Sequence, residues 1–167
     1  TRLPLKQIYQ ESPSRHLVTW QNLEYVARGI AHYKKVHSMF DYTDMLEQFV
    51  SGDYCPKLEV VIVDEAQDLS ALQWKMVHKI AQRAEHVYIA GDDDQAIFEW
   101  AGADVKKFLS LTGDKVILPQ SFRIPRSVHR LASDVVSRIK KRYVKPWSPK
   151  LEEGKVEYVS DEQEIDF

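Results

Sequence analysis

The sequence predicts an α/β fold in which a parallel sheet is flanked by helices. The main observation is residues 58–68, LEVVIVDEAQD, where an unbroken apolar run ends in two carboxylates. A short continuous apolar run of this kind is typical of a strand that is buried on both faces of a parallel sheet. A second run, residues 86–90 (HVYIA), follows after a segment with helical spacing. This alternation of strand, helix and strand indicates a parallel sheet with right-handed crossovers.

The composition is that of an ordinary globular protein. The 167 residues are 44% hydrophobic and 29% charged, with a formal net charge of −2, so any binding of nucleic acid must rest on local patches of charge. Cys55 is the only cysteine; an intrachain disulfide is therefore excluded, and a reducing, cytoplasmic interior is expected. No apolar run approaches the roughly 20 residues that a membrane span needs. The missing N-terminal Met and the acidic final stretch indicate a piece of a longer protein.

Two helices are expected ahead of the first strand. Residues 1–20 contain two prolines and predict only turns. Apolar residues at helical spacing predict a helix over residues 22–37. Asp41 is the expected N-cap of a second helix over residues 42–50.

Further elements are expected after residue 68. Ser70 and Gln73 form a capping-box pattern, which predicts a helix over residues 71–83. Its predicted buried stripe leaves Trp74 and His78 outside and consists of Leu72, Met76 and Ile80. The remaining predicted elements are a short helix, a third strand (KVIL), a long helix that begins at a proline, a linker and one more strand, over residues 103–111, 115–118, 125–142, 145–153 and 155–159.

Three predicted strands end in polar residues that are capable of chemistry, namely residues 64–68, 91–95 and 120–123. Because ligands bind at the carboxyl ends of parallel strands, these residues are expected to share one site. Asp64 could hold the shell of a Mg²⁺ ion, and Glu65 could take a proton from water. An amide and a guanidinium in the other two segments suit a phosphate-bearing ligand. The plain alternative for the acidic pair is a polar strand end with a capping Asp.

Three strings of residues resemble a known family in content, order and spacing. They are VDEAQD, GDDDQAIFEWAGAD and LPQSFRIP, which resemble motifs II, III and IV of superfamily 1 DNA helicases of the UvrD/Rep/PcrA type. Residues 40–46 resemble the segment that precedes motif II, and the resemblance covers residues 40–159. It implies a partial RecA-like (P-loop NTPase) sheet, ATP and Mg²⁺ as cofactors, and single-stranded and duplex DNA as partners, with replication or repair proteins as further candidates.

At the nucleotide, the resemblance implies a catalytic role for three residues. Glu65 is the implied base that activates water, Gln95 is implied to sense the γ-phosphate, and Arg123 is implied to reach it. Asp64 is the implied ligand of Mg²⁺. The residues alone leave one alternative open here, in which Arg123 pairs with a local Asp.

The resemblance also implies contacts to adenine and to DNA. Phe122 would stack on adenine, and Gln67 with Asp68 would couple the nucleotide to the rest of the domain. Phe98 and Trp100 lie where the family places aromatics against bases of single-stranded DNA, and such stacking is worth about 1–3 kcal/mol per base. Trp100 could instead be a core aromatic, and Phe122 could pack under the sheet. Gln67 and Asp68 could only order the start of the following helix.

A cluster of basic residues lies at the end of the long predicted helix. Contact with DNA phosphates could explain it, but an exposed helix end carries such charges in any case, and exposure is the favoured interpretation. The members of the cluster are Arg138, Lys140, Lys141, Arg142 and Lys145.

The chain departs from the family pattern in ways that bear on activity. It contains no G-x-x-x-x-G-K-[ST] segment to cradle phosphates, and no match to motifs V and VI. Ala101 stands where an arginine is common. The expected organisation is the tail of an inserted helical subdomain (residues 1–40), the C-terminal part of a first RecA-like domain (residues 41–145), and a linker with the first strand of a second RecA-like domain (residues 146–167).

These observations predict a fragment of an ATP-dependent DNA helicase, which couples ATP hydrolysis to translocation on single-stranded DNA and to duplex unwinding. The fragment alone is expected to hydrolyse no ATP, because a P-loop is what holds the β- and γ-phosphates. Two alternatives stay open. One is the helicase subunit of a recombination nuclease, and the other is a degenerate helicase-like module that only binds DNA or a protein.

Overall fold

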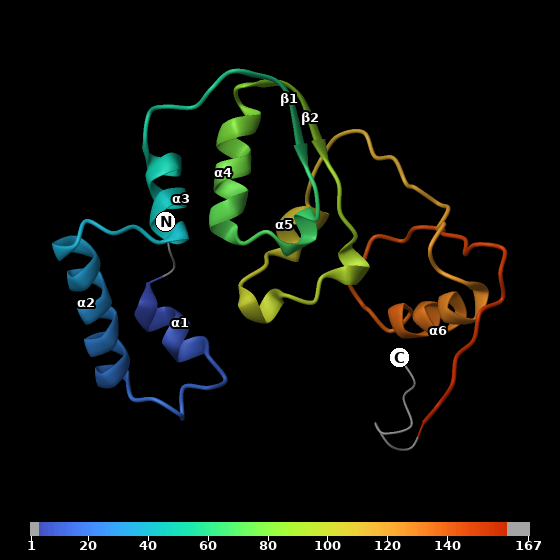
Figure 1. Ribbon diagram of the computed structural model, residues 1–167, viewed down its shortest axis with the longest axis horizontal. Helices are drawn as coiled ribbons and strands as arrows, with labels where there is room; N and C mark the ends of the chain where they lie inside the picture. The colour runs from blue at the N-terminus through green and yellow to red at the C-terminus, as the bar shows by residue number, and fades with distance from the viewer. Residues whose placement is uncertain (1–3, 160–167) are drawn as a thin grey trace.

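The computed structural model describes residues 4–159, which run from an N-terminal helical part into a small α/β unit and then into a mostly irregular segment around one more helix (Figure 1). The helices and strands of these residues are α1 Leu5–Glu11, α2 Trp20–Val36, α3 Tyr42–Ser51, β1 Leu58–Val63, α4 Ala71–Ala81, β2 Ala84–Ile89, α5 Val105–Leu109 and α6 Arg126–Val136. Within residues 4–159, no helix combines the length and the apolar character that a membrane span requires.

The strands β1 and β2 form a parallel pair, as the alternation of strand, helix and strand predicts. Val60 pairs with His86, and Val63 pairs with Ile89. The helix α4 makes the crossover between the two strands (Figure 1). A parallel strand pair joined through a helix is consistent with the predicted α/β class. The strand β2 begins two residues earlier than the sequence pattern predicts.

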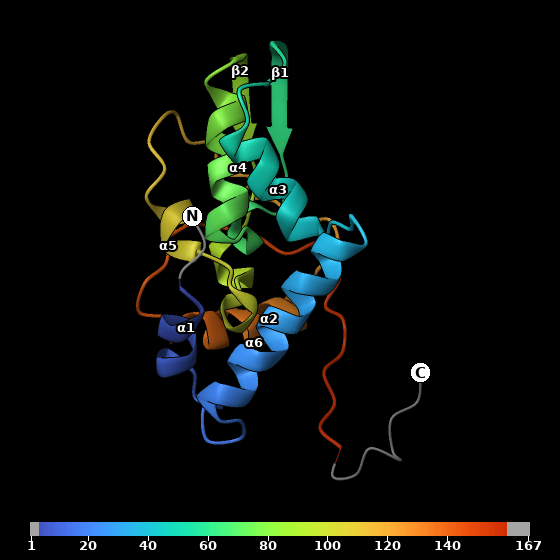
Figure 2. The same ribbon diagram turned by 90° about the vertical axis from the view of Figure 1, so that its left-hand side faces the viewer.

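The predicted burial of β1 on both faces is wrong for the described chain. One face of the sheet packs against α4 and contributes Val63 and Ile89 to the contacts around the core. On the other face, Ile62 and Tyr88 are exposed. The reason is that α4 covers one face only: it lies on one side of the two strands in Figure 1 and in front of them in Figure 2. The apolar run therefore predicts the strand correctly but does not report how many faces are covered.

The core is centred on Trp74, which the predicted stripe of α4 leaves outside. The capping box of Ser70 and Gln73 forms as predicted and sets the start of α4. From that start, Trp74 and Val77 turn inward and are buried, whereas the three residues of the predicted stripe are only half-buried. The stripe was wrong because Phe108, from α5, also packs against this side of α4. Helical periodicity alone does not register such a long-range neighbour.

The predicted third strand does not form. Residues 115–118 belong to no helix or strand, and the side chains of Val116 and Leu118 are exposed. A strand needs a neighbouring strand to form hydrogen bonds with its backbone N–H and C=O groups, and the run KVIL has none among residues 4–159. The predicted strand over residues 155–159 is absent for the same reason.

The N-terminal part is more helical than predicted. The helix α1 occupies the interval between Pro4 and Pro13, where only turns were expected, because both prolines lie outside it. The Tyr9 hydroxyl donates to the carbonyl of Val18, 2.9 Å away, and the Tyr9 ring packs on Trp20 at 5.7 Å between ring centroids. These contacts hold α1 against the start of α2.

The helix α3 begins as predicted. The Asp41 carboxylate accepts a hydrogen bond from the Asp44 N–H, and the Asp44 carboxylate accepts one from the Asp41 N–H. Lys34 of α2 pairs with both carboxylates, at 2.9 and 2.5 Å. The carboxylates hydrogen-bond Lys34 and raise the pKa of its ammonium group above its ordinary value. The cap of α3 therefore also joins α2 to α3, which in turn packs against α4.

The helix α6 ends at Val136, six residues earlier than the predicted end at residue 142. The hydroxyl of Ser137 donates to the carbonyl of Asp134, 2.8 Å away, and so competes for the backbone at this end. The chain beyond it then runs toward the end of the sheet, where its basic residues find partners (Figure 1).

Candidate functional site

The ends of β1 and β2 continue side by side beyond the last strand residues. The Ala90 N–H donates to the carbonyl of Val63 at 2.8 Å, and the Ala66 N–H donates to the carbonyl of Ala90 at 3.0 Å. These bonds bring residues 64–68 and residues 91–95 to the same edge of the sheet. Two of the three polar strand ends expected from the sequence therefore meet.

Glu65 turns the chain at this edge. Its backbone lies in the left-handed region, at φ 49° and ψ 40°, which is uncommon for a residue other than glycine. Its N–H donates to the Asp64 carboxylate at 2.9 Å. The turn leads directly into the 3₁₀ turn Ala66–Asp68, in which Gln67 is buried. As a result, the carboxylates of Asp64 and Glu65 face solvent while the next polar side chain points inward.

Gln67 joins the two strand ends through its side-chain amide. It is only 1% exposed. Its Nε2 donates to the Glu65 carboxylate at 2.8 Å, and its Oε1 accepts from the Asp92 N–H at 3.0 Å. The alternative in which Gln67 only orders the start of α4 is wrong, because Gln73 holds Ser70 instead.

Gly91 leaves room for this buried amide. A Cβ atom at this position would come within 2.6 Å of the Gln67 Oε1 and 3.0 Å of the Phe108 ring. Both distances are too short for a side chain without displacement of its neighbours. The glycine therefore allows residues 91–95 to approach residues 64–68 closely enough for the amide to bridge them.

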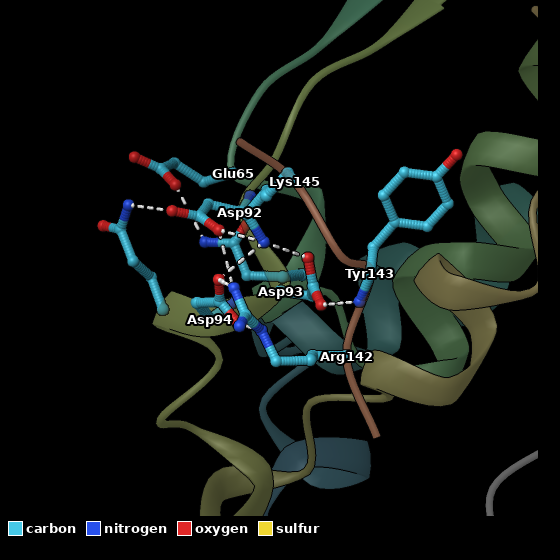
Figure 3. Close-up of polar contacts among 9 residues, drawn as sticks. Glu65, Asp92, Asp93, Asp94, Arg142, Tyr143 and Lys145 are labelled. Atoms are coloured by element: carbon cyan, nitrogen blue, oxygen red, sulfur yellow. Dashed lines mark hydrogen bonds and ion pairs between the residues drawn. The ribbon is translucent and has the colours of Figure 1, made fainter. Parts of the chain in front are cut away.

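Gln95 belongs to the same network through Asp92. The Gln95 Nε2 donates to the Asp92 carboxylate at 2.7 Å. Burial raises the pKa of Asp92, but hydrogen bonds from Gln95 and Lys145 lower it more, so the pKa of Asp92 lies below its ordinary value. Asp92 thus stays charged and holds the Gln95 amide at the edge of the sheet. Figure 3 shows Glu65 and Asp92 on neighbouring chain segments.

Two members of the predicted basic cluster, Arg142 and Lys145, are not exposed. Arg142 makes a bidentate pair with Asp94, with both distances at 2.7 Å. Lys145 lies 2.9, 2.6 and 2.8 Å from carboxylate oxygens of the three consecutive aspartates Asp92, Asp93 and Asp94 (Figure 3). The favoured interpretation of these two residues as an exposed helix end is therefore wrong, and they are equally not free for DNA phosphates. The run of three aspartates was the one trace of this cluster in the sequence.

The two predicted DNA-contacting aromatics lie on the surface between β2 and α5. Trp100 is 83% exposed, so the alternative that makes it a core aromatic is wrong. Phe98 is partly exposed, and its ring centroid lies 6.4 Å from that of Trp100 with the planes tilted by 50°. The two rings together present an apolar surface that unstacked bases could use.

Phe122 and Arg123 stand apart from the network around Gln67. Phe122 is 87% exposed and does not pack under a sheet. Among the described residues, the Arg123 guanidinium has no hydrogen-bond or ion-pair partner, so the alternative of a local Asp is wrong. The third strand that would have aligned these residues with Glu65 and Gln95 is missing. Instead, the loop is held from the other side, where the Ser121 N–H donates to the carbonyl of Ser148 at 2.8 Å.

The donor set at the sheet edge fits a hydrated Mg²⁺ ion better than a bare metal cage. No cluster of three or more ligating side chains that could hold a metal exists within residues 4–159. The three aspartates of residues 92–94 are already compensated by Arg142 and Lys145. The Asp64 carboxylate remains exposed. One carboxylate is a common protein ligand for Mg²⁺, which retains several waters and binds substrate phosphates.

The fold and the site together define a class of protein, the UvrD-type helicase N-terminal domain. A parallel α/β unit carries an acidic pair at one strand end and an aspartate–glutamine turn at the next, in the order of the motif strings. Residues 3–115, more than half of the chain, match the family described as UvrD/REP helicase N-terminal domain. The chain belongs to this family, and the resemblance predicted from the motif strings is confirmed.

Individual relatives agree with this assignment. The chain is 31% identical over 118 residues to the ATP-dependent DNA helicase PcrA of Bacillus subtilis, covering 67% of the chain and 16% of that protein. It is 29% identical over 123 residues to PcrA of Staphylococcus aureus, covering 68% of the chain and 17% of that protein. It is 28% identical over 161 residues to the putative ATP-dependent DNA helicase YjcD of Bacillus subtilis, covering 86% of the chain and 20% of that protein. The chain thus spans no more than a fifth of the length of these relatives.

Proposed function

We propose that this chain is part of an ATP-dependent DNA helicase, in which it supplies the water-activating side of the ATPase site and a surface for single-stranded DNA. The relatives that it matches are named as ATP-dependent DNA helicases. The observation that carries the proposal is the bridge made by Gln67, which joins the Glu65 carboxylate to the backbone of Asp92. The same Asp92 holds the Gln95 amide.

In this proposal, each residue at the sheet edge has a chemical task. When bound, Mg²⁺ neutralises phosphate charge and Asp64 holds its water shell. Glu65 accepts the proton of the attacking water, which suits its exposed carboxylate at the strand end. Gln95 orients the water or reads the γ-phosphate. Because Gln67 contacts Glu65 and the Asp92 backbone at once, a displacement of residues 91–95 by the nucleotide is passed to the base.

The remaining ATP contacts come from residues outside this network. Arg123 compensates charge on the γ-phosphate, and its exposed guanidinium, which pairs with nothing among residues 4–159, is available for that. Phe122 stacks on adenine through its exposed ring. Both residues approach the nucleotide when it lies between this α/β unit and the loop that carries them. The chain contains no phosphate-cradling G-x-x-x-x-G-K-[ST] segment, and we propose that the chain alone hydrolyses no ATP.

The surface for DNA is formed by Phe98 and Trp100. Stacking on aromatic rings tolerates any base, which a motor that moves along a strand requires. Ala101 offers no charge beside them, so stacking rather than phosphate contact provides the affinity at this point. Residues 1–40, 41–145 and 146–167 are in this proposal the tail of an inserted helical subdomain, the C-terminal part of a RecA-like domain, and the connection to a second one, in a cytoplasmic protein.

The test is Glu65→Gln in the full-length protein that carries this chain, with ATP turnover and nucleotide binding measured separately. A lost general base lowers the turnover rate by about 10²–10⁴-fold, while binding of a fluorescent ATP analogue is retained because the side chain keeps its shape. Glu59→Gln, at an exposed position on β1, the strand that leads to Glu65, is the matched control and leaves both quantities unchanged. Unchanged turnover in Glu65→Gln would contradict the role of Glu65 and favour a module that only binds DNA or a protein.

A further inference from the structure

Residues 142–153, which we call the strap, connect two loops that no other described element joins directly. The strap follows α6 and runs past the end of the sheet before it returns to the start of α6 (Figure 1). One end of it contacts residues 92–94, beside Gln95. The other end contacts residues 119–125, which carry Phe122 and Arg123.

The first anchor is a compact group of charges. Arg142 makes a bidentate pair with Asp94, and Lys145 contacts all three aspartates. The Tyr143 N–H donates to the Asp93 carboxylate at 2.6 Å. The side chains of Asp93 and Asp94 are only 4% and 8% exposed, and that of Lys145 is 18% exposed. Salt screens such sheltered pairs much less than surface pairs. The anchor is therefore expected to persist at cellular ionic strength.

This anchor reaches the proposed catalytic groups through a short series of contacts. Lys145 pairs with Asp92 at 2.9 Å, and the same carboxylate accepts from Gln95. The backbone of Asp92 donates to Gln67, which in turn donates to Glu65. Figure 3 shows Lys145 and Arg142 converging on the three aspartates from one side while Glu65 lies beyond Asp92. Lys145 itself contacts neither Gln95 nor Glu65, the two residues of this series that would contact ATP.

The second anchor consists of backbone hydrogen bonds to the loop of residues 119–125. The Ser148 N–H donates to the carbonyl of Pro119 at 2.6 Å, and the Lys150 N–H donates to the carbonyl of Ile124 at 2.9 Å. The ring of Trp147 packs edge-on against His129 of α6, with 4.0 Å between ring centroids. The strap is thus paired with this loop on both sides of Phe122 and Arg123.

The strap also closes the start of α6. The backbone N–H groups of Arg126 and Ser127 donate to the carbonyls of Glu152 and Glu153, at 3.0 and 2.8 Å. These are two of the orphan donors that every helix start leaves. The position of the loop before α6 is therefore set by its hydrogen bonds to the strap and not by a strand.

We propose that the strap is a positioning element, in which Lys145 and Arg142 set the placement of Gln95 and Glu65 relative to Phe122 and Arg123. The inference rests on the proposed function, because these four residues are its nucleotide-facing groups. Lys145 and Arg142 are positioning residues: they act through the aspartates and do not contact ATP. The strap takes the part that a continuous sheet would otherwise play, since the segment of residues 115–118 makes no strand here.

The first arm of the test measures geometry without any activity. In a Cys55→Ala background, spin labels are attached at Ile97→Cys and Leu118→Cys, both exposed and outside the proposed site. Paired labels in the full-length protein give a narrow distance distribution between the two loops. Lys145→Met broadens or shifts it, whereas Lys145→Arg preserves it. Lys155→Met, which removes an exposed pair with Glu157, is the matched control and also preserves it.

The second arm measures ATP turnover of the same variants. Outer partners that orient metal ligands contribute about 10–100-fold to affinity or activity, and Lys145 holds Asp92 and Gln95 in a comparable way. Lys145→Met is therefore expected to lower kcat by at least about tenfold, with the KM for ATP nearly unchanged. Lys145→Arg restores most of kcat. Arg142→Lys, which keeps the charge but loses the bidentate contact, is the milder variant should Lys145→Met fail to fold, and it lowers kcat by less than Lys145→Met does.

Unchanged label distances in Lys145→Met and Arg142→Lys would overturn the proposal, and so would altered distances with unchanged kcat. The two proposals can fail separately. If Glu65→Gln lowers turnover but Lys145→Met changes neither the label distances nor kcat, the strap proposal fails and the proposed function stands. If Glu65→Gln leaves turnover unchanged while the label distances respond to Lys145→Met, the proposed function fails and the placement of the two loops by the strap stands.

Discussion

Replacement of Gln67 by alanine should be among the most damaging single changes in the α/β unit. The amide donates to the Glu65 carboxylate and accepts from the Asp92 N–H. A hydrogen bond to a charged group contributes about 1.5–3 kcal/mol, and a buried donor left without a partner costs about 1–3 kcal/mol. The Glu65 carboxylate is exposed and regains a hydrogen bond from water, so the loss of its bond to Gln67 lies at the low end of the first range. The Asp92 N–H is partly buried, so its loss of a partner adds to this cost. We expect Gln67→Ala to lower the free energy of unfolding by about 3 kcal/mol.

Urea unfolding of the full-length protein, followed by tryptophan fluorescence, measures this quantity. The matched control is Gln7→Ala, since Gln7 donates a comparable bond to Glu11 at 3.0 Å on the exposed face of α1. Solvent-exposed side-chain pairs on a helix contribute only about 0.2–0.5 kcal/mol. A loss below about 1 kcal/mol in Gln67→Ala, similar to the control, would show that the amide does not bridge the two strand ends.

Two further predictions follow from the same region. Trp100→Ala should weaken binding of single-stranded DNA by about 1–3 kcal/mol, measured by fluorescence anisotropy, and should leave the thermal midpoint unchanged, because the side chain is 83% exposed; equal affinity in the variant would remove Trp100 from the DNA surface. Because the pKa of Asp92 in the folded protein lies below its ordinary value of 3.8, the charged carboxylate stabilises the fold at pH values above 3.8, and this stability is lost as the pH falls through the folded pKa. Asp92→Asn should therefore make the free energy of unfolding fall less steeply below about pH 4. An unchanged pH profile of the unfolding free energy would refute this.

Local signals in the sequence predicted the helix starts well. The N-cap at Asp41 and the capping box at Ser70 each depend on residues within one turn of one another, and both form as predicted. The two strands are likewise contained in short apolar runs that need only each other. The edge of the sheet, with Asp64 and Glu65 beside residues 91–95, follows from these two strands alone.

The features that depend on distant partners could not be predicted from the sequence. A third strand requires a neighbour, and residues 115–118 have none within the described chain. The inward turn of Trp74 depends on α5, and the charge cluster joins aspartates to Arg142 across 48 positions. The local sequence around the aspartates and around Arg142 gives no sign that the two segments pair.

The candidate site shows the same division. The motif strings predicted Gln67, and the structure adds what it touches. The prediction that Arg123 shares one site with Glu65 and Gln95 stays a prediction. It depended on a third strand, over residues 115–118, which does not form. The sequence predicts the strap only as part of a basic cluster and a linker, because the partners of the strap lie in segments distant in sequence.

The left-handed backbone of Glu65 has a consequence for how this protein can vary. A non-glycine residue in that conformation is held there at a cost of about 1–3 kcal/mol, and glycine would adopt it freely. Variants selected only for greater heat resistance should therefore accumulate glycine at this position, and they would lose the carboxylate in the same step. Persistence of the acid under such selection would indicate that the turn is already relaxed by its surroundings.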